Sequence, residues 1–208
     1  MGLYKINEIF SSLQGEGFNT GRPVVFIRFA GCNLDCVWCD TDCSAYEEMD
    51  DESILAAVAA FGVKSIVITG GEPTANDNLL ELTRRLKQDG YWIALETNGV
   101  NGLPEEAESL FDYIAVSPKA AYAALYEQAS AVGFADEVRV VVDGEIFDFC
   151  KFIEDRIVAH HYYLSPCCGA DKTFNALQTI QILGQLNTRK SAKKWGLSLQ
   201  THKMADIR

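Results

Sequence analysis

The chain has 208 residues, of which 48% are apolar and 11% aromatic, so it holds enough apolar material for one compact core. We therefore expect a single domain over residues 1–208. Charged residues make up 23% of the chain, which argues against a disordered chain, a collagen-like fibre or a membrane bundle. The net charge of −11 repels phosphate backbones, so we expect no nucleic-acid partner.

The amino-terminal sequence MGLYKINEIF lacks the charged segment and the apolar run of a secretory signal. No stretch approaches the roughly 18 uninterrupted apolar residues of a transmembrane helix. We therefore expect a cytoplasmic protein that does not associate with membranes and whose thiols stay reduced. Four of the seven cysteines lie between residues 32 and 43, and this grouping indicates metal or cluster chemistry rather than disulfides.

Short β-branched or aromatic runs, each ended by turn residues, predict buried strands along the chain. They lie at residues 24–31, 65–71, 91–99, 113–118, 137–144, 161–166 and 196–200. Apolar residues at helical spacing predict helices at residues 54–61, 79–86 and 174–186. Because continuous apolar runs are typical of strands buried on both faces, the pattern predicts an α/β fold with a mainly parallel sheet and crossover helices.

The residues with the most distinctive chemistry directly follow the first four predicted strands. They occupy residues 31–39, 70–73, 96–99 and 117–119. In parallel α/β folds the functional sites lie at the carboxyl ends of the strands, so we expect one site that gathers these segments.

The segment GCNLDCVWCDT places Cys32, Cys36 and Cys39 in a C-x3-C-x2-C arrangement on a predicted loop. Soft thiolate ligands select zinc or an iron–sulfur cluster. If Cys43 also binds, four thiolates complete a closed structural zinc site. If only three cysteines bind, a four-iron cluster keeps one iron open to a substrate. The spacing favours the cluster and leaves the role of Cys43 open.

This cysteine motif after a glycine-ended strand, together with GGEP at residues 70–73, resembles the signature of the radical S-adenosylmethionine (SAM) superfamily. Further motifs are similar to one member family, the 7-carboxy-7-deazaguanine synthases. These motifs are FSSLQGEG, FIRFAGCN, WCDT, VITGGEP, ETNG, VSPK and LSLQTHK. They run from residue 10 to residue 203, so the resemblance covers nearly the whole chain.

The resemblance implies a partial (reduced) radical-SAM β/α barrel, usually homodimeric, with a [4Fe–4S] cluster, S-adenosylmethionine and Mg²⁺. It implies a carbon–nitrogen lyase that converts 6-carboxy-5,6,7,8-tetrahydropterin to 7-carboxy-7-deazaguanine with loss of ammonia, in queuosine and deazapurine biosynthesis. The reducing electron would come from a donor such as flavodoxin or ferredoxin. In such an enzyme the cofactors supply the difficult chemistry, and the protein supplies a dry cavity that directs it.

Arg28 lies inside a predicted buried strand, where an unpaired guanidinium costs several kcal/mol. We therefore expect Arg28 to face the cavity and bind the substrate carboxylate, with an internal salt bridge as the alternative. Gln14 and Glu16 offer an amide and a carboxylate to the donor edge of a pterin. By resemblance, Leu13, Gln14 and Gly15 also contact substrate, largely through the backbone.

The resemblance assigns other residues to substrate and cofactors. Thr97 maps onto a substrate contact. Thr41 maps onto the magnesium ligand, which suits an ion that prefers oxygen ligands and keeps several waters, although Thr41 could instead cap the loop. We expect Glu72 to accept a hydrogen bond from the ammonium group of S-adenosylmethionine. The positions that map onto S-adenosylmethionine contacts are Trp38, Cys39, Asp40, Gly70, Gly71, Glu72, Gly99, Ser117, Pro118, Lys119, Leu164, Ser165, Pro166 and Cys167.

The carboxy-terminal part of the chain carries the weakest assignments. LSPC at residues 164–167 departs from the family pattern, with Ser165 and then the adjacent pair Cys167 and Cys168. His202 and Lys203 match a tail motif to which we assign a structural role. Whether Arg208 closes over the pterin is left open.

Two other functions fit parts of the pattern. A radical-SAM activating enzyme that acts on a protein uses the same cysteine spacing, but FSSLQGEG and Arg28 favour a small carboxylated substrate. A non-catalytic module could instead be held around structural zinc by Cys32, Cys36, Cys39 and Cys43. Iron, sulfide and a brown colour in anaerobically prepared protein would exclude the zinc module.

Overall fold

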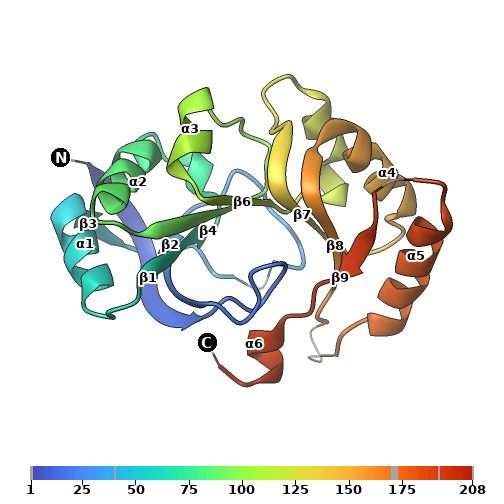
Figure 1. Cartoon of the computed structure of the whole chain (residues 1–208), viewed down its shortest axis with the longest axis horizontal. Coiled ribbons are helices and arrows are strands. Elements are labelled where there is room, and N and C mark those ends of the chain that lie inside the picture. The colour runs from blue at the N-terminus through green and yellow to red at the C-terminus, as the bar shows by residue number, and fades with distance from the viewer. Residues whose placement is uncertain (1, 40, 170–172, 192, 208) are drawn as a thin grey trace.

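The computed structural model describes residues 2–39, 41–169, 173–191 and 193–207. Within these residues, one nine-stranded sheet has the order β3-β1-β2-β4-β5-β6-β7-β8-β9 (Figure 1). The strands from β2 to β9 pair in parallel, while β1 and β3 form an antiparallel edge. The sheet curves but the strands at its two ends do not pair among the described residues, so the predicted partial barrel and mainly parallel sheet are confirmed.

All seven predicted strands are present, and the structure adds two that the sequence analysis did not identify, β1 and β3. The strands are β1 (Leu3–Leu13), β2 (Pro23–Phe29), β3 (Glu47–Asp50), β4 (Ser65–Gly70), β5 (Trp92–Thr97), β6 (Tyr113–Val116), β7 (Phe134–Val142), β8 (Val158–Pro166) and β9 (Trp195–Leu197).

The helices lie mainly on the outer side of the curved sheet (Figure 1). They are α1 (Asp51–Ala59), α2 (Leu79–Gln88), α3 (Glu105–Leu110), α4 (Phe147–Arg156), α5 (Ala176–Thr188) and α6 (Thr201–Met204), with 3-10 helices η1 (Pro73–Ala75) and η2 (Ala120–Glu127). Helix α1 is capped by Asp50, whose side chain accepts a hydrogen bond from the Ser53 backbone N–H.

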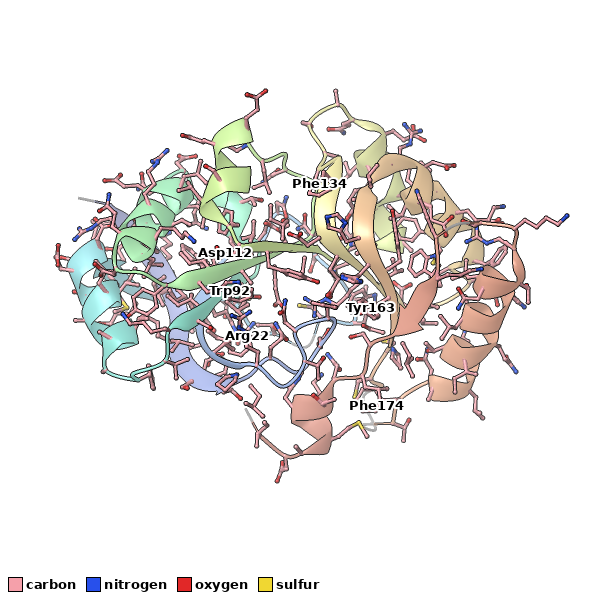
Figure 2. The ribbon with its side chains drawn as sticks, viewed as in Figure 1. Arg22, Trp92, Asp112, Phe134, Tyr163 and Phe174 are labelled. Atoms are coloured by element: carbon pink, nitrogen blue, oxygen red, sulfur yellow. The ribbon has the colours of Figure 1, made fainter. Side chains whose placement is uncertain are left out.

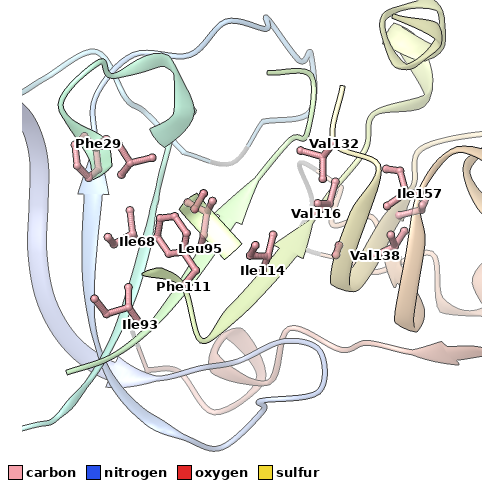
Figure 3. Close-up of a cluster of buried hydrophobic side chains, with 14 of the residues drawn as sticks. Phe29, Ile68, Ile93, Leu95, Phe111, Ile114, Val116, Val132, Val138 and Ile157 are labelled. Carbon is pink, nitrogen blue, oxygen red and sulfur yellow. The ribbon is translucent and has the colours of Figure 1, made fainter. Parts of the chain in front are cut away.

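The main core fills the space between the sheet and its helices (Figure 3). Because successive strand side chains point to opposite faces, Ile27 and Phe29 of β2 reach this core while Phe26 belongs to a second, smaller cluster. The same alternation places Arg28 on the face of Phe26. Phe10 of β1 stacks on Phe26 with ring centroids 5.0 Å apart. The inner face of the barrel is therefore apolar at one end, and Arg28 follows the apolar side chains along β2.

The predicted apolar stripe of the third helix is wrong in its details. Helix α5 starts at Ala176 rather than at residue 174, and it buries Thr179, Ile182 and Leu186. Leu177 and Ile180, which were expected to face the core, are 79% and 53% exposed. The buried Thr179 hydroxyl is satisfied by donating to the Asn175 carbonyl at 3.1 Å, so a polar residue occupies a core position that an apolar pattern cannot reveal.

The β1–β2 loop at residues 14–22 folds across the inner side of the sheet. Its Arg22 guanidinium stacks over the Trp92 ring of β5, 3.6 Å from the centroid, and Figure 2 labels both residues in this region. At the other end of the chain, Thr201 in α6 donates both its backbone N–H and its hydroxyl to the Gly15 carbonyl. The loop and the carboxy-terminal tail are thus held together.

Candidate active site

A cavity of about 530 Å³ lies at the carboxyl ends of the parallel strands, within the range of about 300–1,000 Å³ that is usual for small-molecule sites. It gathers segments from all four predicted positions. The predicted site residues that line it are Leu13, Gln14, Gly15, Glu16, Arg28, Cys32, Cys36, Trp38, Cys39, Thr41, Gly70, Gly71, Thr97, Ser117, Lys119, Ser165, Pro166 and Cys167. The cavity is also lined by Cys43 and Cys168.

Four other predicted ligand contacts do not line this cavity: Glu72, Gly99, Pro118 and Leu164. Leu164 is fully buried in the main core. Gly99 has a positive φ of 79°, and a Cβ there would lie 2.5 Å from a methyl carbon of Val116. Backbone conformation and packing against Val116 therefore both require glycine at this position. Asp40 lies outside the described residues.

Glu72 is fully buried, and its carboxylate serves the protein rather than the cavity. One oxygen accepts from the Thr74 backbone N–H and hydroxyl and from the Thr97 hydroxyl, at 2.6–3.0 Å. The other oxygen accepts from the Asn98 backbone N–H at 2.6 Å. The expected contact with a ligand ammonium group is therefore not supported by this arrangement. Glu72 instead links the loop after β4 to the loop after β5 and holds Thr97 in place.

The cysteine loop is fastened to the neighbouring strand ends by hydrogen bonds. The Glu72 backbone N–H donates to the Gly31 carbonyl at 2.9 Å, and the Gly31 N–H donates to the Cys43 carbonyl at 3.0 Å. The Trp38 indole N–H donates to Asp143 after β7 at 2.7 Å. These contacts fix both ends and the middle of the loop.

The thiols of Cys32, Cys36 and Cys39 are soft ligands of the kind that iron–sulfur clusters use, and they line the same cavity. Burial raises the pKa of Cys32 and Cys36, and raises that of Cys43 to about 11. Because a ligating cysteine must be a thiolate, binding of the positive irons has to displace these protons. No group of three or more His, Cys, Asp or Glu side chains in the described part of the chain is arranged to hold a metal ion. A single ion needs its ligands close together, whereas an iron–sulfur cluster binds its thiolates on different irons and so joins thiols that lie further apart.

Two features of the cavity wall fit a bound S-adenosylmethionine beside such a cluster. A Cβ on Gly71 would lie 1.9 Å from the Gly31 carbonyl oxygen and 3.0 Å from the Cys32 Cβ, so only glycine lets the two loops approach this closely. The Ser165 hydroxyl is buried against the cavity and has no hydrogen-bond partner among the described residues. A buried hydroxyl without a partner favours a ligand with hydrogen-bonding groups.

We expect Gly71→Ala to lose most of its reconstituted iron and to lower the Tm by about 2–12 °C, because overpacking costs about 1–3 kcal/mol in a domain of this size. The added methyl group pushes the cysteine loop away from β4. Iron analysis and thermal unfolding of the anaerobic protein measure both effects. Gly184→Ala is the matched control, since a Cβ on this exposed helical glycine meets nothing within 4 Å. Equal iron content in the two variants would contradict the expectation.

Lys119 is partly buried beside the cysteine loop. Its ammonium group donates to the Ser117 hydroxyl at 2.7 Å and lies 5.2 Å from the Trp38 ring centroid. Burial lowers the pKa of Lys119, and the Cys36 thiolate opposes that shift. A partly buried cation at this position suits the negative charge that thiolates and a ligand carboxylate bring.

Arg28 lies at the cavity, as expected, and it also forms the internal salt bridge that was the alternative. It lines the cavity, and its Nε donates to Glu8 at 2.9 Å, directly across the β1–β2 pair. The salt bridge was the alternative to substrate binding, yet it uses only the Nε edge of the guanidinium. The pair therefore orients Arg28 at the cavity wall.

Arg139 is the main functional candidate that the sequence analysis missed. It lies in β7, is 6% exposed, lines the cavity and contacts the carboxylates of Glu16, Glu96 and Glu137. Burial lowers the pKa of a guanidinium, but the three carboxylates raise that of Arg139 above its ordinary value. The available signal was a charge inside the apolar run EVRVVVDG, the same signal that identified Arg28.

The carboxy-terminal tail also belongs to the cavity. Gln200, His202 and Lys203 line it, so the last two, to which a structural role was assigned, also lie where a ligand could contact them. His202 lies against Gly15, where a Cβ would be 2.0 Å from the imidazole Nδ1. Arg208 lies outside the described residues.

Comparison with known proteins agrees with this geometry. Residues 26–127 match the model of the radical SAM superfamily. The chain is 50% identical over 204 residues to the 7-carboxy-7-deazaguanine synthase of Haemophilus influenzae, covering 98% of this chain and 94% of the relative. It is 40% identical over 211 residues to the synthase of the same name from Bacteroides thetaiotaomicron, covering 99% and 100%.

A solved structure, that of QueE from Escherichia coli, superimposes with a TM-score of 0.67 at 25% identity and covers 95% of this chain and 93% of that one. No helix of the described residues is long and apolar enough to cross a membrane. Membership of the superfamily implies a [4Fe–4S] cluster and S-adenosylmethionine, and it argues against the zinc-held module. Sequence, fold and cavity together show that this chain belongs to the 7-carboxy-7-deazaguanine synthase family of radical SAM enzymes.

Proposed function

We propose that the cavity binds 6-carboxy-5,6,7,8-tetrahydropterin against the cluster and converts it to 7-carboxy-7-deazaguanine with loss of ammonia. The observation that carries this proposal is the placement of complementary groups in one cavity. A guanidinium at Arg28 faces it from β2, and Gln14 and Glu16 face it from the β1–β2 loop. A carboxylate and a donor-rich aminopyrimidinone edge are the two groups that this set of side chains recognises.

The chain's own residues bind, orient and shield the reactants. Cys32, Cys36 and Cys39 would hold the cluster, and the Ser165 hydroxyl would bind S-adenosylmethionine. When bound, these cofactors would supply the radical chemistry of the reaction. The β1–β2 loop and the tail are hydrogen-bonded to each other and both line the cavity, so they would limit the access of water to the reacting atoms.

Magnesium completes the proposed cofactor set, with Thr41 as its protein ligand. Thr41 lines the cavity next to Cys39. One threonine oxygen together with substrate oxygens and waters satisfies an ion that rarely has an all-protein site. The two positive charges of Mg²⁺ would offset the substrate carboxylate during ring contraction.

Thr41→Ala should therefore raise the magnesium concentration needed for half-maximal turnover by about tenfold, the effect of losing one ligand contact of about 1.4 kcal/mol. Thr41→Ser, which keeps the hydroxyl, is the matched control and should titrate close to wild type. The measurement is product formation against Mg²⁺ concentration at saturating substrate. A titration of Thr41→Ala that superimposes on wild type would remove Thr41 from the ligand set.

The reducing electron is proposed to come from flavodoxin or ferredoxin, and the enzyme is proposed to act as a homodimer in the cytoplasm. We also propose that residues 1–208 form a single domain. Sedimentation of the reconstituted protein tests the dimer, and reduction of the cluster by each candidate donor tests the electron source.

The deciding experiment is an anaerobic assay of the full chain with its cluster reconstituted, supplied with S-adenosylmethionine, Mg²⁺, dithionite and the carboxypterin. We expect 7-carboxy-7-deazaguanine and 5′-deoxyadenosine to form together. Formation of 5′-deoxyadenosine without the deazaguanine would show that radical generation is intact and that the proposed substrate is wrong.

A further inference from the structure

Arg139 joins three carboxylates that come from three parts of the fold. Its Nη1 contacts Glu16 in the β1–β2 loop at 2.9 Å, and its Nη2 contacts Glu96 at the end of β5 at 2.6 Å. Its Nε lies 2.7 Å from Glu137, two residues back on β7. The Nε contact is an ion pair without hydrogen-bond geometry. One guanidinium therefore fixes the spacing of a loop carboxylate and a strand carboxylate.

Two of the three carboxylates line the cavity, whereas the third does not. Glu16 and Glu96 line the large cavity, but Glu137 does not. Glu137 is 1% exposed and accepts from the Tyr113 hydroxyl and the Phe18 backbone N–H, both at 2.8 Å. Arg139 is thus held by Glu137 on the side away from the cavity, and it contacts Glu16 and Glu96 at the cavity wall.

Side-chain amides also donate hydrogen bonds to Glu16 and Glu96. Gln14 donates to Glu96 at 3.0 Å, and Gln200 of the tail donates to Glu16 at 2.8 Å. Burial alone would raise the pKa of Glu96, but Arg139 and the hydrogen bonds from Gln14 and Thr69 lower it, which keeps this carboxylate ionised. Three carboxylates contact one guanidinium, so this wall carries excess negative charge and spare acceptor capacity.

We propose that Arg139 is a positioning residue that sets Glu16 and Glu96 at the spacing needed to accept hydrogen bonds from the amino and ring N–H groups of the pterin. The inference rests on the proposed function. It adds that Arg139 controls specificity for the amino and ring N–H edge of the pterin. A planar fork fixes two carboxylates at once, and a lysine ammonium at the same position does not reproduce this geometry.

The test compares two ligands on two proteins, each reconstituted with its cluster and supplied with S-adenosylmethionine under anaerobic conditions. The ligands are the carboxypterin and its analogue with hydrogen in place of the exocyclic amino group. Wild type should bind the carboxypterin roughly 10- to 100-fold more tightly, the effect of a hydrogen bond to a charged group. In Arg139→Lys this ratio should fall to about threefold or less, because the Kd of the carboxypterin rises while that of the analogue barely changes.

Arg189→Lys is the matched control, since Arg189 pairs with Glu154 away from the cavity; its ratio should equal that of wild type. If Arg139→Lys fails to hold its cluster, the double variant Arg139→Met with Glu137→Gln keeps the net charge without the fork and should lose the same discrimination. Equal weakening of both ligands, or a wild type that does not distinguish them, would overturn the inference. A wild type that binds neither ligand would instead overturn the proposed function.

Discussion

Replacing Cys32, Cys36 or Cys39 by alanine is expected to abolish cluster binding and turnover, whereas Cys43→Ala is expected to retain both. A site with three thiolates leaves one iron open to S-adenosylmethionine, so each of the three cysteines is indispensable. The structural contact of Cys43 is made by its backbone carbonyl, which accepts from Gly31 at 3.0 Å and survives side-chain truncation. Iron and sulfide analysis with visible absorbance measures the cluster, and about four irons per chain mark full loading.

Cys43→Ala is itself the control for this series, because its side chain also lines the cavity. Cys150→Ala offers a second control at a fully buried core thiol far in sequence from the motif. Loss of the cluster in Cys43→Ala as complete as in Cys36→Ala would show that four cysteines bind.

The second large effect is expected for Arg28→Ala, which should lose product formation while still cleaving S-adenosylmethionine slowly without substrate. Truncating a charge-assisted contact to a carboxylate in a dry cavity costs roughly 2–5 kcal/mol, or on the order of 30-fold or more in binding. Arg28→Lys should recover only part of the loss, because a point charge does not reproduce the fork. Product and 5′-deoxyadenosine measured in the same reaction separate the two effects.

The salt bridge to Glu8 supplies the control for a purely structural role of Arg28. In Glu8→Gln the amide oxygen still accepts from the Arg28 Nε, so the loss of product should be much smaller than in Arg28→Ala. If Arg28→Ala abolishes substrate-free cleavage, Arg28 serves the cofactor or the fold, and its assignment to substrate fails.

The sequence predicted the parallel strands because their apolar runs are continuous, and it predicted the position of the cavity because distinctive residues follow those strands. Period-two alternation explains why Arg28 faces inward with Phe26. The same reasoning applies to Arg139, but two of its three carboxylate partners, Glu16 and Glu96, come from distant segments. Ion-pair partners separated by 43 and 123 positions leave no local pattern in a sequence.

Other differences have equally specific causes. Glu72 was expected at the ligand because GGEP forms a strand-end turn, yet its acceptors are used by Thr74, Thr97 and Asn98. Strand β1 was not predicted because its burial alternates irregularly, with a register shift between Ile6 and Glu8. The helical spacing predicted α5 correctly, but it did not predict which face of the helix is buried, because the buried Thr179 interrupts the apolar stripe.

The contact between the tail and the β1–β2 loop has a consequence for synthesis of the protein. From β5 onward each strand pairs with the one translated just before it, so the sheet grows in the order in which the ribosome delivers it. The bond from Thr201 to Gly15 instead closes over 186 positions of the chain. A nascent chain would therefore possess most of its sheet while its β1–β2 loop still lacks this contact, and this part of the cavity wall is completed only after Thr201 has been added.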